Sequence, residues 1–257
     1  MIKMKGCVYM EILKINNLSK TYEGKVSYQA LKNINLSIEE GEFVAVMGPS
    51  GSGKSTLLNV ISTIDRPTKG EVILNSKKPH DLKGQDLANF RRNELGFVFQ
   101  NFNLLDTLTI GENIVLPLTL DGVSVNEMNI RLKEISKKLG IEQIINKRTF
   151  EVSGGQTQRA AIARGIINKP SILLADEPTG NLDSKSTYDV MDLFTKINTE
   201  NKMTTLMVTH EPYTASFCNR IIFIKDGEIY RELNKKGDRE AFYEEILSVL
   251  SQIGGAR

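Results

Sequence analysis

The segment "EFVAVMGPSGSGKSTLLNVIS", residues 42–62, indicates the fold class of the whole chain. It opens with the apolar run 43–47, a pattern typical of a strand that is covered on both faces of a sheet. After the turn, apolar residues recur with the period of a helix. A buried strand that passes directly into a helix predicts an α/β fold. The glycine-rich turn between them consists of Gly48, Pro49, Ser50, Gly51, Ser52, Gly53, Lys54, Ser55 and Thr56.

This turn has the spacing G-x-x-x-x-G-K-[ST] of a phosphate-binding loop. Its glycines let backbone N–H groups turn inward around an anion, and the following helix adds the positive end of its dipole. Lys54 supplies a charge for the β- and γ-phosphates of ATP, and the hydroxyl of Ser55 is a suitable ligand for Mg²⁺. A Gly/Ser linker that contains a lysine is the alternative, and the flanking strand and helix disfavour it.

A second apolar run, in "SILLADEP" (171–178), ends in the carboxylates of Asp176 and Glu177. Carboxylates at the carboxyl end of a parallel strand point into the crevice where ligands bind. Asp176 is placed to orient Mg²⁺, and Glu177 is placed to polarise an attacking water as a general base. Two charged residues that merely end a strand are a common alternative. Combined with the phosphate loop, however, the pair predicts a nucleotide hydrolase.

The rest of the chain predicts a mostly parallel sheet with helices on its faces. A helix is expected at 184–200 and a third buried strand at 204–210, and a hairpin should turn at Asp226-Gly227. The helix should bury Val190, Met191, Leu193 and Phe194.

Two regions depart from the parallel pattern. The first forty residues alternate apolar and polar, which predicts an antiparallel β subdomain, whereas residues 86–165 predict an inserted α-helical subdomain. We expect one nucleotide-binding domain over 10–235 and a helical C-terminal extension over 236–257. Apolar residues at helical spacing in the extension should pack on the protein's own surface rather than on a partner; they are Phe242, Ile246, Val249 and Ile253.

Composition excludes several classes of protein. The 257 residues carry a formal net charge of +2, so we expect no nucleic-acid partner. Cys7 and Cys218 are far apart in sequence and suit a reducing compartment. The longest apolar-rich stretch, 114–120, is too short to span a bilayer. Residues 1–9 are expected to be disordered or a start-site artefact, because Met10 would be a more ordinary start.

A third motif, "VSGGQTQR" (152–159), places a serine and two glycines at the start of another helix. Ser153 alone would be an ordinary N-cap. It stands, however, 23 residues before Asp176 and 99 residues after Lys54. With these motifs in this order, the sequence resembles the nucleotide-binding domains of ABC transporters from about residue 11 to residue 233. In that family the signature residues cover the ATP of a partner domain; here they are Ser153, Gly154, Gly155 and Gln156.

The resemblance implies roles for four more residues. Tyr22 matches the aromatic that stacks on adenine, and Gln100 matches the glutamine that contacts magnesium. Asp183 matches the aspartate of the dimer-contacting loop, and His210 matches the histidine that contacts the γ-phosphate. A surface tyrosine, a strand-end glutamine and an unremarkable histidine are the alternatives. Thr157 departs from the Gln, Lys or Arg common in the family, a minor change in the signature helix.

The resemblance also implies how the protein works. One phosphate loop and one signature per chain imply a homodimer that sandwiches two ATP molecules head to tail. The chain would power a separate integral membrane permease from the cytoplasmic face of the membrane, with a membrane sensor kinase as a further partner. The segments 102–118 and 175–184 resemble the group that includes lipoprotein-releasing and macrolide-efflux ATPases, and the segment 210–247 looks closer still to ATPases of bacitracin-type peptide resistance transporters. Lipoprotein-release or macrolide-efflux ATPases, and a soluble ABC ATPase outside transport, are the alternatives.

Overall fold

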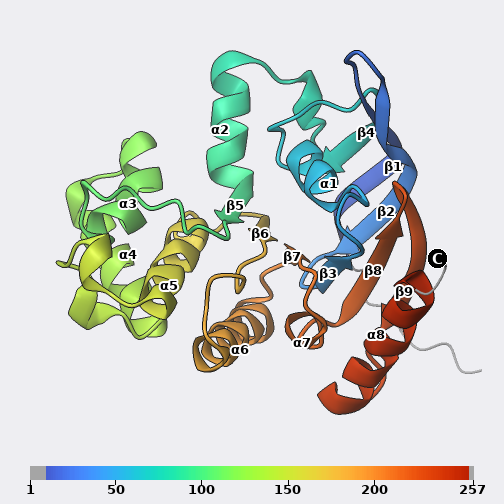
Figure 1. The fold of residues 1–257 in the computed structure, drawn as a ribbon. Coiled ribbons are helices and arrows are strands. Elements are labelled where there is room, and N and C mark those ends of the chain that lie inside the picture. The colour runs from blue at the N-terminus through green and yellow to red at the C-terminus, as the bar shows by residue number, and fades with distance from the viewer. Residues whose placement is uncertain (1–9, 255–257) are drawn as a thin grey trace, which may run out of the picture.

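A computed structural model describes residues 10–254, so the prediction for residues 1–9 lies outside the described part of the chain. Two sheets organise the fold (Figure 1): a core sheet in the order β5-β6-β7-β3-β8-β9 and a smaller sheet in the order β2-β1-β4. The strands are β1 (Glu11–Tyr22), β2 (Tyr28–Glu39), β3 (Phe43–Met47), β4 (Lys69–Leu74), β5 (Leu95–Val98), β6 (Ile172–Asp176), β7 (Thr205–Val208), β8 (Arg220–Lys225) and β9 (Glu228–Asn234).

The core sheet is parallel except for its last strand, because β9 pairs antiparallel with β8. All five residues of β3 are buried in the middle of this sheet. They alternate between two separate hydrophobic clusters: Phe43, Ala45 and Met47 pack in one, and Val44 and Val46 pack in the other. Both faces of the strand are therefore covered, and the expected α/β fold is confirmed.

The smaller sheet is antiparallel, as expected for the N-terminal region, since β1 pairs with β2 on one side and with β4 on the other. The pairing of β1 with β2 is irregular near the end of the hairpin. Lys20 pairs with Leu31 and Thr21 pairs with Gln29, which leaves Ala30 without a partner, as in a β-bulge. Bulges re-aim the neighbouring side chains, and this one lies beside the phosphate loop described below.

Helices α3, α4 and α5 form a lobe on the side of the core sheet away from the smaller sheet (Figure 1). Three short 3-10 helices accompany the α-helices: η1 (Pro79–Asp81), η2 (Glu142–Ile144) and η3 (Thr149–Glu151). The α-helices are α1 (Lys54–Ile61), α2 (Gly84–Glu94), α3 (Ile110–Leu120), α4 (Val125–Lys138), α5 (Gly154–Ile166), α6 (Ser184–Asn201), α7 (Pro212–Ala215) and α8 (Arg239–Gly254).

The range 86–165 is not helical throughout, and this corrects the expected content of the helical subdomain. Strand β5 lies inside it and pairs in parallel with β6, so it belongs to the core sheet. Its sequence, LGFV, follows α2 without a turn and is interrupted by a glycine, so no continuous apolar run separates it from the helical pattern. Gly96 also lets helix α5 approach closely, since a Cβ there would lie 2.3 Å from the carbonyl oxygen of Gly165.

The C-terminal part follows the expected pattern. Asp226 and Gly227 both have positive φ, at 51° and 82°, as a tight two-residue hairpin turn requires. The four apolar residues expected on α8 are buried in the larger hydrophobic cluster, as are the four expected on α6. Arg239, at the start of α8, lies 4.4 Å from the ring centre of Phe217. Among residues 10–254, no helix is both long enough and apolar enough to cross a membrane.

Candidate nucleotide site

The candidate site lies where the carboxyl ends of three neighbouring strands meet. Strands β6, β7 and β3 are adjacent and parallel in the core sheet. The phosphate loop 48–56 follows β3, Asp176 ends β6 and Glu177 comes directly after it, and His210 comes two residues after β7. Ligands of open α/β sheets bind at this edge. The topology therefore brings the residues predicted for phosphate binding and hydrolysis to one place.

Backbone of other segments approaches the phosphate loop closely. A Cβ on Gly48 would lie 2.0 Å from the carbonyl oxygen of Ile224, and one on Gly53 would lie 2.5 Å from that of Ala30. Lys54 Nζ donates hydrogen bonds to the carbonyl oxygens of Gly48 at 2.8 Å and Pro49 at 2.9 Å. These bonds keep the ammonium inside the loop, and the two glycines are required by the close packing.

Charged side chains gather at the loop, and the attraction between their opposite charges only partly offsets the effect of burial on their pKa values. Burial lowers the pKa of Lys54, although the carboxylates of Glu177 and Asp176 act in the opposite direction. Burial, and next the charge of Glu177, raise the pKa of Asp176, which Lys54 partly offsets. The Ser52 hydroxyl is buried without a hydrogen-bond partner among the described residues. Such a site favours a ligand that brings both a cation and hydrogen-bonding oxygens.

These residues fit a magnesium nucleotide rather than a protein-only metal site. Within residues 10–254, no group of three or more His, Cys, Asp or Glu side chains is arranged to hold a metal ion. Mg²⁺ in phosphate-transfer sites takes one or two protein oxygens and completes its shell with waters and phosphates. The hydroxyl of Ser55, the carboxylate of Asp176 and the amide oxygen of Gln100 are the protein oxygens expected to hold it.

Glu177 and His210 contact each other directly. With Nδ1 protonated, His210 donates a hydrogen bond to Glu177 Oε1 at 2.8 Å. The backbone of Glu177 has φ of 46°, an uncommon conformation for a non-glycine residue that is often found at functional sites. Its N–H is anchored to the Val208 carbonyl oxygen at 2.9 Å. The carboxylate is therefore fixed from both the backbone and the histidine.

The signature residues form an ordered helix start. Ser153 caps α5, and its side chain and that of Gln156 each accept a hydrogen bond from the other residue's backbone N–H. Thr157, the departure from the family pattern, is accommodated because its hydroxyl donates to the Ser153 carbonyl oxygen at 3.0 Å. Nearby, Asp183 caps α6. In the described part of the chain, no hydrogen bond joins the signature residues 153–156 to the phosphate loop.

Gln100 and Tyr22 lie at the margins of the site. Gln100 follows β5 and packs against Gly180, where a Cβ would lie 2.7 Å from its Nε2. Asn181 Nδ2 donates to the Gln100 carbonyl oxygen at 3.1 Å. Tyr22 ends β1 with its side chain partly exposed, and Lys20 Nζ lies 4.8 Å from its ring centre.

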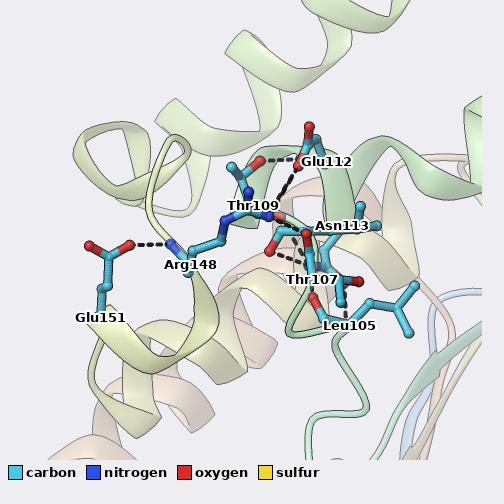
Figure 2. Close-up of polar contacts among 8 residues, drawn as sticks. Leu105, Thr107, Thr109, Glu112, Asn113, Arg148 and Glu151 are labelled. Atoms are coloured by element: carbon cyan, nitrogen blue, oxygen red, sulfur yellow. Dashed lines mark hydrogen bonds and ion pairs between the residues drawn. The ribbon is translucent and has the colours of Figure 1, made fainter.

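Polar contacts join the loop after Gln100 to the segment that precedes the signature (Figure 2). Arg148 donates to the Thr107 carbonyl oxygen, and it forms an isolated antiparallel bridge with Thr109. Asn113 is fully buried and binds both the N–H and the carbonyl oxygen of Leu105, at 2.7 and 3.0 Å. The two segments thus form one connected unit, although about forty residues separate them.

Two residues at the site were not predicted from sequence. The hydroxyl of Tyr28 donates to the carbonyl oxygen of Gly51 in the phosphate loop at 3.0 Å. Gln158 is fully buried on α5, and its Nε2 donates to the carbonyl oxygen of Pro178, next to Glu177, at 2.5 Å. The sequence signal for Tyr28 is its aromatic type close to Tyr22, which does not report its contact with Gly51. Gln158 offers only its place five residues after Ser153.

The chain is similar to known proteins over nearly all its length. The sequence profile of the family described as "ABC transporter" matches residues 31–180. "ABC transporter ATP-binding protein YxdL" of Bacillus subtilis is 63% identical over 95% of each chain. "Bacitracin export ATP-binding protein BceA" of Halalkalibacterium halodurans is 46% identical over 96% of this chain and 99% of its own.

A solved structure agrees with these sequence matches. It is the dimeric post-hydrolysis state of the ATP-binding cassette MJ0796, a Methanocaldococcus jannaschii protein, bound to ADP and Pi. It superimposes with a TM-score of 0.79 at 47% identity, over 88% of this chain and 99% of that one. With the phosphate loop, the acidic strand end and the signature helix in their expected places, the chain belongs to the ABC transporter family, as one of its ATP-binding ATPases.

Proposed function

We propose that this chain is the ATPase subunit of a transporter that acts against antimicrobial peptides, and that two copies close head to tail around two ATP molecules. The observation that carries the proposal is the meeting of Lys54, Asp176, Glu177 and His210 at one sheet edge. Glu177 accepts a proton from the attacking water as general base, and His210 holds its carboxylate in position. Lys54 and the loop N–H groups stabilise the phosphate charge. Bound Mg²⁺ supplies further charge neutralisation.

The dimer is supported by the position of the signature residues. No hydrogen bond joins 153–156 to the loop of the same chain in the described residues, so the signature does not serve the nucleotide of its own chain and is available to that of a second chain. The MJ0796 relative was solved as a dimer with ADP and Pi. Two identical surfaces related by a two-fold axis would place each signature over the partner's phosphate loop. Magnesium as the metal, and the assigned roles of Tyr22, Gln100 and Asp183, are part of this proposal.

The surface around the loop after Gln100 supports a partner that bears membrane spans. This loop, 101–106, runs between two grooves. One groove is lined by residues of α2, β5, α3 and α5, including Phe97 and Leu116, and by Phe99 directly after β5. The other includes Phe150, which is 78% exposed. Large exposed apolar side chains beside polar rims mark interaction sites, and we assign this one to a permease that holds the chain at the cytoplasmic face of the membrane.

The assignment of antimicrobial peptides as the cargo rests on similarity to one relative whose name states a function. BceA is a bacitracin export protein by name, and the two chains match over almost their full lengths. The resemblance of the 210–247 segment points to the same group. A membrane sensor kinase as a further partner stays a prediction. Lipoprotein release or macrolide efflux is the alternative for the cargo.

A co-purification experiment tests the partner surface. Tagged wild-type chain should retain an integral membrane protein from native membranes, whereas Leu105→Asp should lose it. Leu105 is 49% exposed, so a carboxylate there is tolerated by the fold but opposes an apolar contact. Ile64→Asp is the matched control, since Ile64 is 59% exposed, follows α1 and lines neither of the two grooves.

Both variants should keep the ATPase rate of the isolated wild-type chain. If the wild type retains no membrane protein, the permease proposal is wrong. If Leu105→Asp retains it as well as Ile64→Asp does, the partner does not bind at this loop.

A further inference from the structure

We propose that Tyr28 is a nucleotide-positioning residue, whose hydroxyl supports the tip of the phosphate loop and whose ring flanks the ribose of the bound nucleotide. The inference rests on nucleotide binding at this loop and adds a residue that neither the motifs nor the resemblance assigns. It is drawn from the contacts between the smaller sheet and the loop.

Tyr28 reaches the part of the loop that the rest of the protein holds least. Gly51 forms the tip, with φ of 79°, and a Cβ built on it would meet nothing within 4 Å. Tyr28 donates to its carbonyl oxygen at 3.0 Å. Among the described residues, Tyr28 is the one side chain from outside residues 48–56 that hydrogen-bonds to this loop. Because the peptide unit is planar, holding this carbonyl also fixes the direction of the Ser52 N–H.

The strand that carries Tyr28 is itself fixed against the loop. A Cβ on Gly53 would lie 2.5 Å from the carbonyl oxygen of Ala30, two residues after Tyr28. The Lys32 N–H donates to the Gly227 carbonyl oxygen at 2.8 Å, and the Gly227 N–H donates to that of Ser52 at 3.2 Å. Strand β2 therefore lies against the loop at Gly51 and Gly53, and Tyr28 is part of that contact.

The pairing of the strands gives the position of the ring. Tyr28 lies directly opposite Tyr22 in the register of β1 and β2, so their Cβ atoms are about 5 Å apart. Tyr22 is the residue assigned to the adenine base, and the loop is assigned to the phosphates. The ribose connects base and phosphates in any nucleotide. A residue that adjoins Tyr22 and also touches Gly51 is placed beside that sugar.

The test uses ADP and inorganic pyrophosphate, since neither is consumed and only ADP carries a ribose. The Kd of each is measured for the wild type, Tyr28→Phe and Tyr28→Ala. Loss of one hydrogen bond in Tyr28→Phe should weaken both ligands by the same factor, about two- to tenfold. Tyr28→Ala should weaken ADP by about a further threefold or more and leave pyrophosphate as in Tyr28→Phe.

Two controls distinguish a failure of the Tyr28 inference from a failure of nucleotide binding at the loop. Tyr230→Phe and Tyr230→Ala alter a tyrosine of similar exposure on β9 and should bind both ligands like the wild type. Lys54→Ala should abolish binding of both, which shows that the loop is the site. If the wild type binds and Lys54→Ala does not, yet both Tyr28 variants bind ADP normally, only the Tyr28 inference is overturned. A Tyr28→Ala variant that weakens ADP and pyrophosphate equally overturns the assignment of the ring to the ribose.

Discussion

Replacing Glu177 by glutamine should stop hydrolysis while leaving ATP bound. In the structure, the carboxylate accepts two hydrogen bonds from His210, from Nδ1 at 2.8 Å and from the backbone N–H at 3.4 Å, and its side chain is 17% exposed. A glutamine oxygen can accept the shorter of these bonds, so the change keeps the size of the side chain and removes the base. Loss of a general base costs about 10²–10⁴ in rate. At about 1.4 kcal/mol per factor of ten, this raises the barrier by about 3–5 kcal/mol.

The assay is phosphate release from purified chain at saturating ATP, with nucleotide retention followed on the same samples. Glu177→Gln should fall to 1% of the wild-type rate or less, keep ATP bound, and elute as a dimer in its presence. Glu211→Gln is the control, because it removes a carboxylate one residue after His210 that, among residues 10–254, accepts a hydrogen bond only from Thr214. The assignment of the base would be refuted by a Glu177→Gln rate above about a tenth of the wild-type value.

Two further predictions concern stability. Glu94 is buried, and although burial raises its pKa, hydrogen bonds from Lys77, Ser171 and Asn75 bring the pKa below the ordinary glutamate value. The ionised Glu94 should therefore stabilise the fold fully above the ordinary glutamate pKa, and this stabilisation should be lost as the pH falls through the lowered pKa of the folded state. Glu94→Gln should lower the free energy of unfolding in urea by about 1–3 kcal/mol at pH 7, and the difference in this free energy between variant and wild type should shrink below about pH 4. Ile246→Ala on α8 removes a fully buried side chain and should cost about 2–5 kcal/mol, whereas Glu245→Ala beside it should cost under 1 kcal/mol; equal melting temperatures would contradict a core role for α8.

The parts of the site that depend on local sequence were predictable. The phosphate loop, the strand end at Asp176 and the helix start at Ser153 each occupy one short segment, so their residue types and spacing show them directly. Contacts between distant segments were not. Tyr28 reaches Gly51 only because β1 and β2 pair in one register with a bulge at Ala30, which no residue spacing reports.

Strand β5 is a second case. Its sequence follows α2 without a turn and contains Gly96, so it does not stand out from the neighbouring helices, and its place in the core sheet comes from pairing with β6, more than seventy residues later. The helical spacing of α8 was visible, by contrast, and its burial followed from the apolar face alone.

Two arginines donate hydrogen bonds to the backbone of the loop after Gln100. Arg148 holds Thr107 from the segment before the signature, and Arg164 on α5 holds the carbonyl oxygens of Phe102 and Asn103. Because these arginines hold the loop on both sides of Leu105, a displacement of that exposed residue would be passed to Arg164 and so to α5. The first residues of α5 would face the other copy's nucleotide in the proposed dimer. A movement that the permease imposes on one chain would then reach the nucleotide site of the other chain.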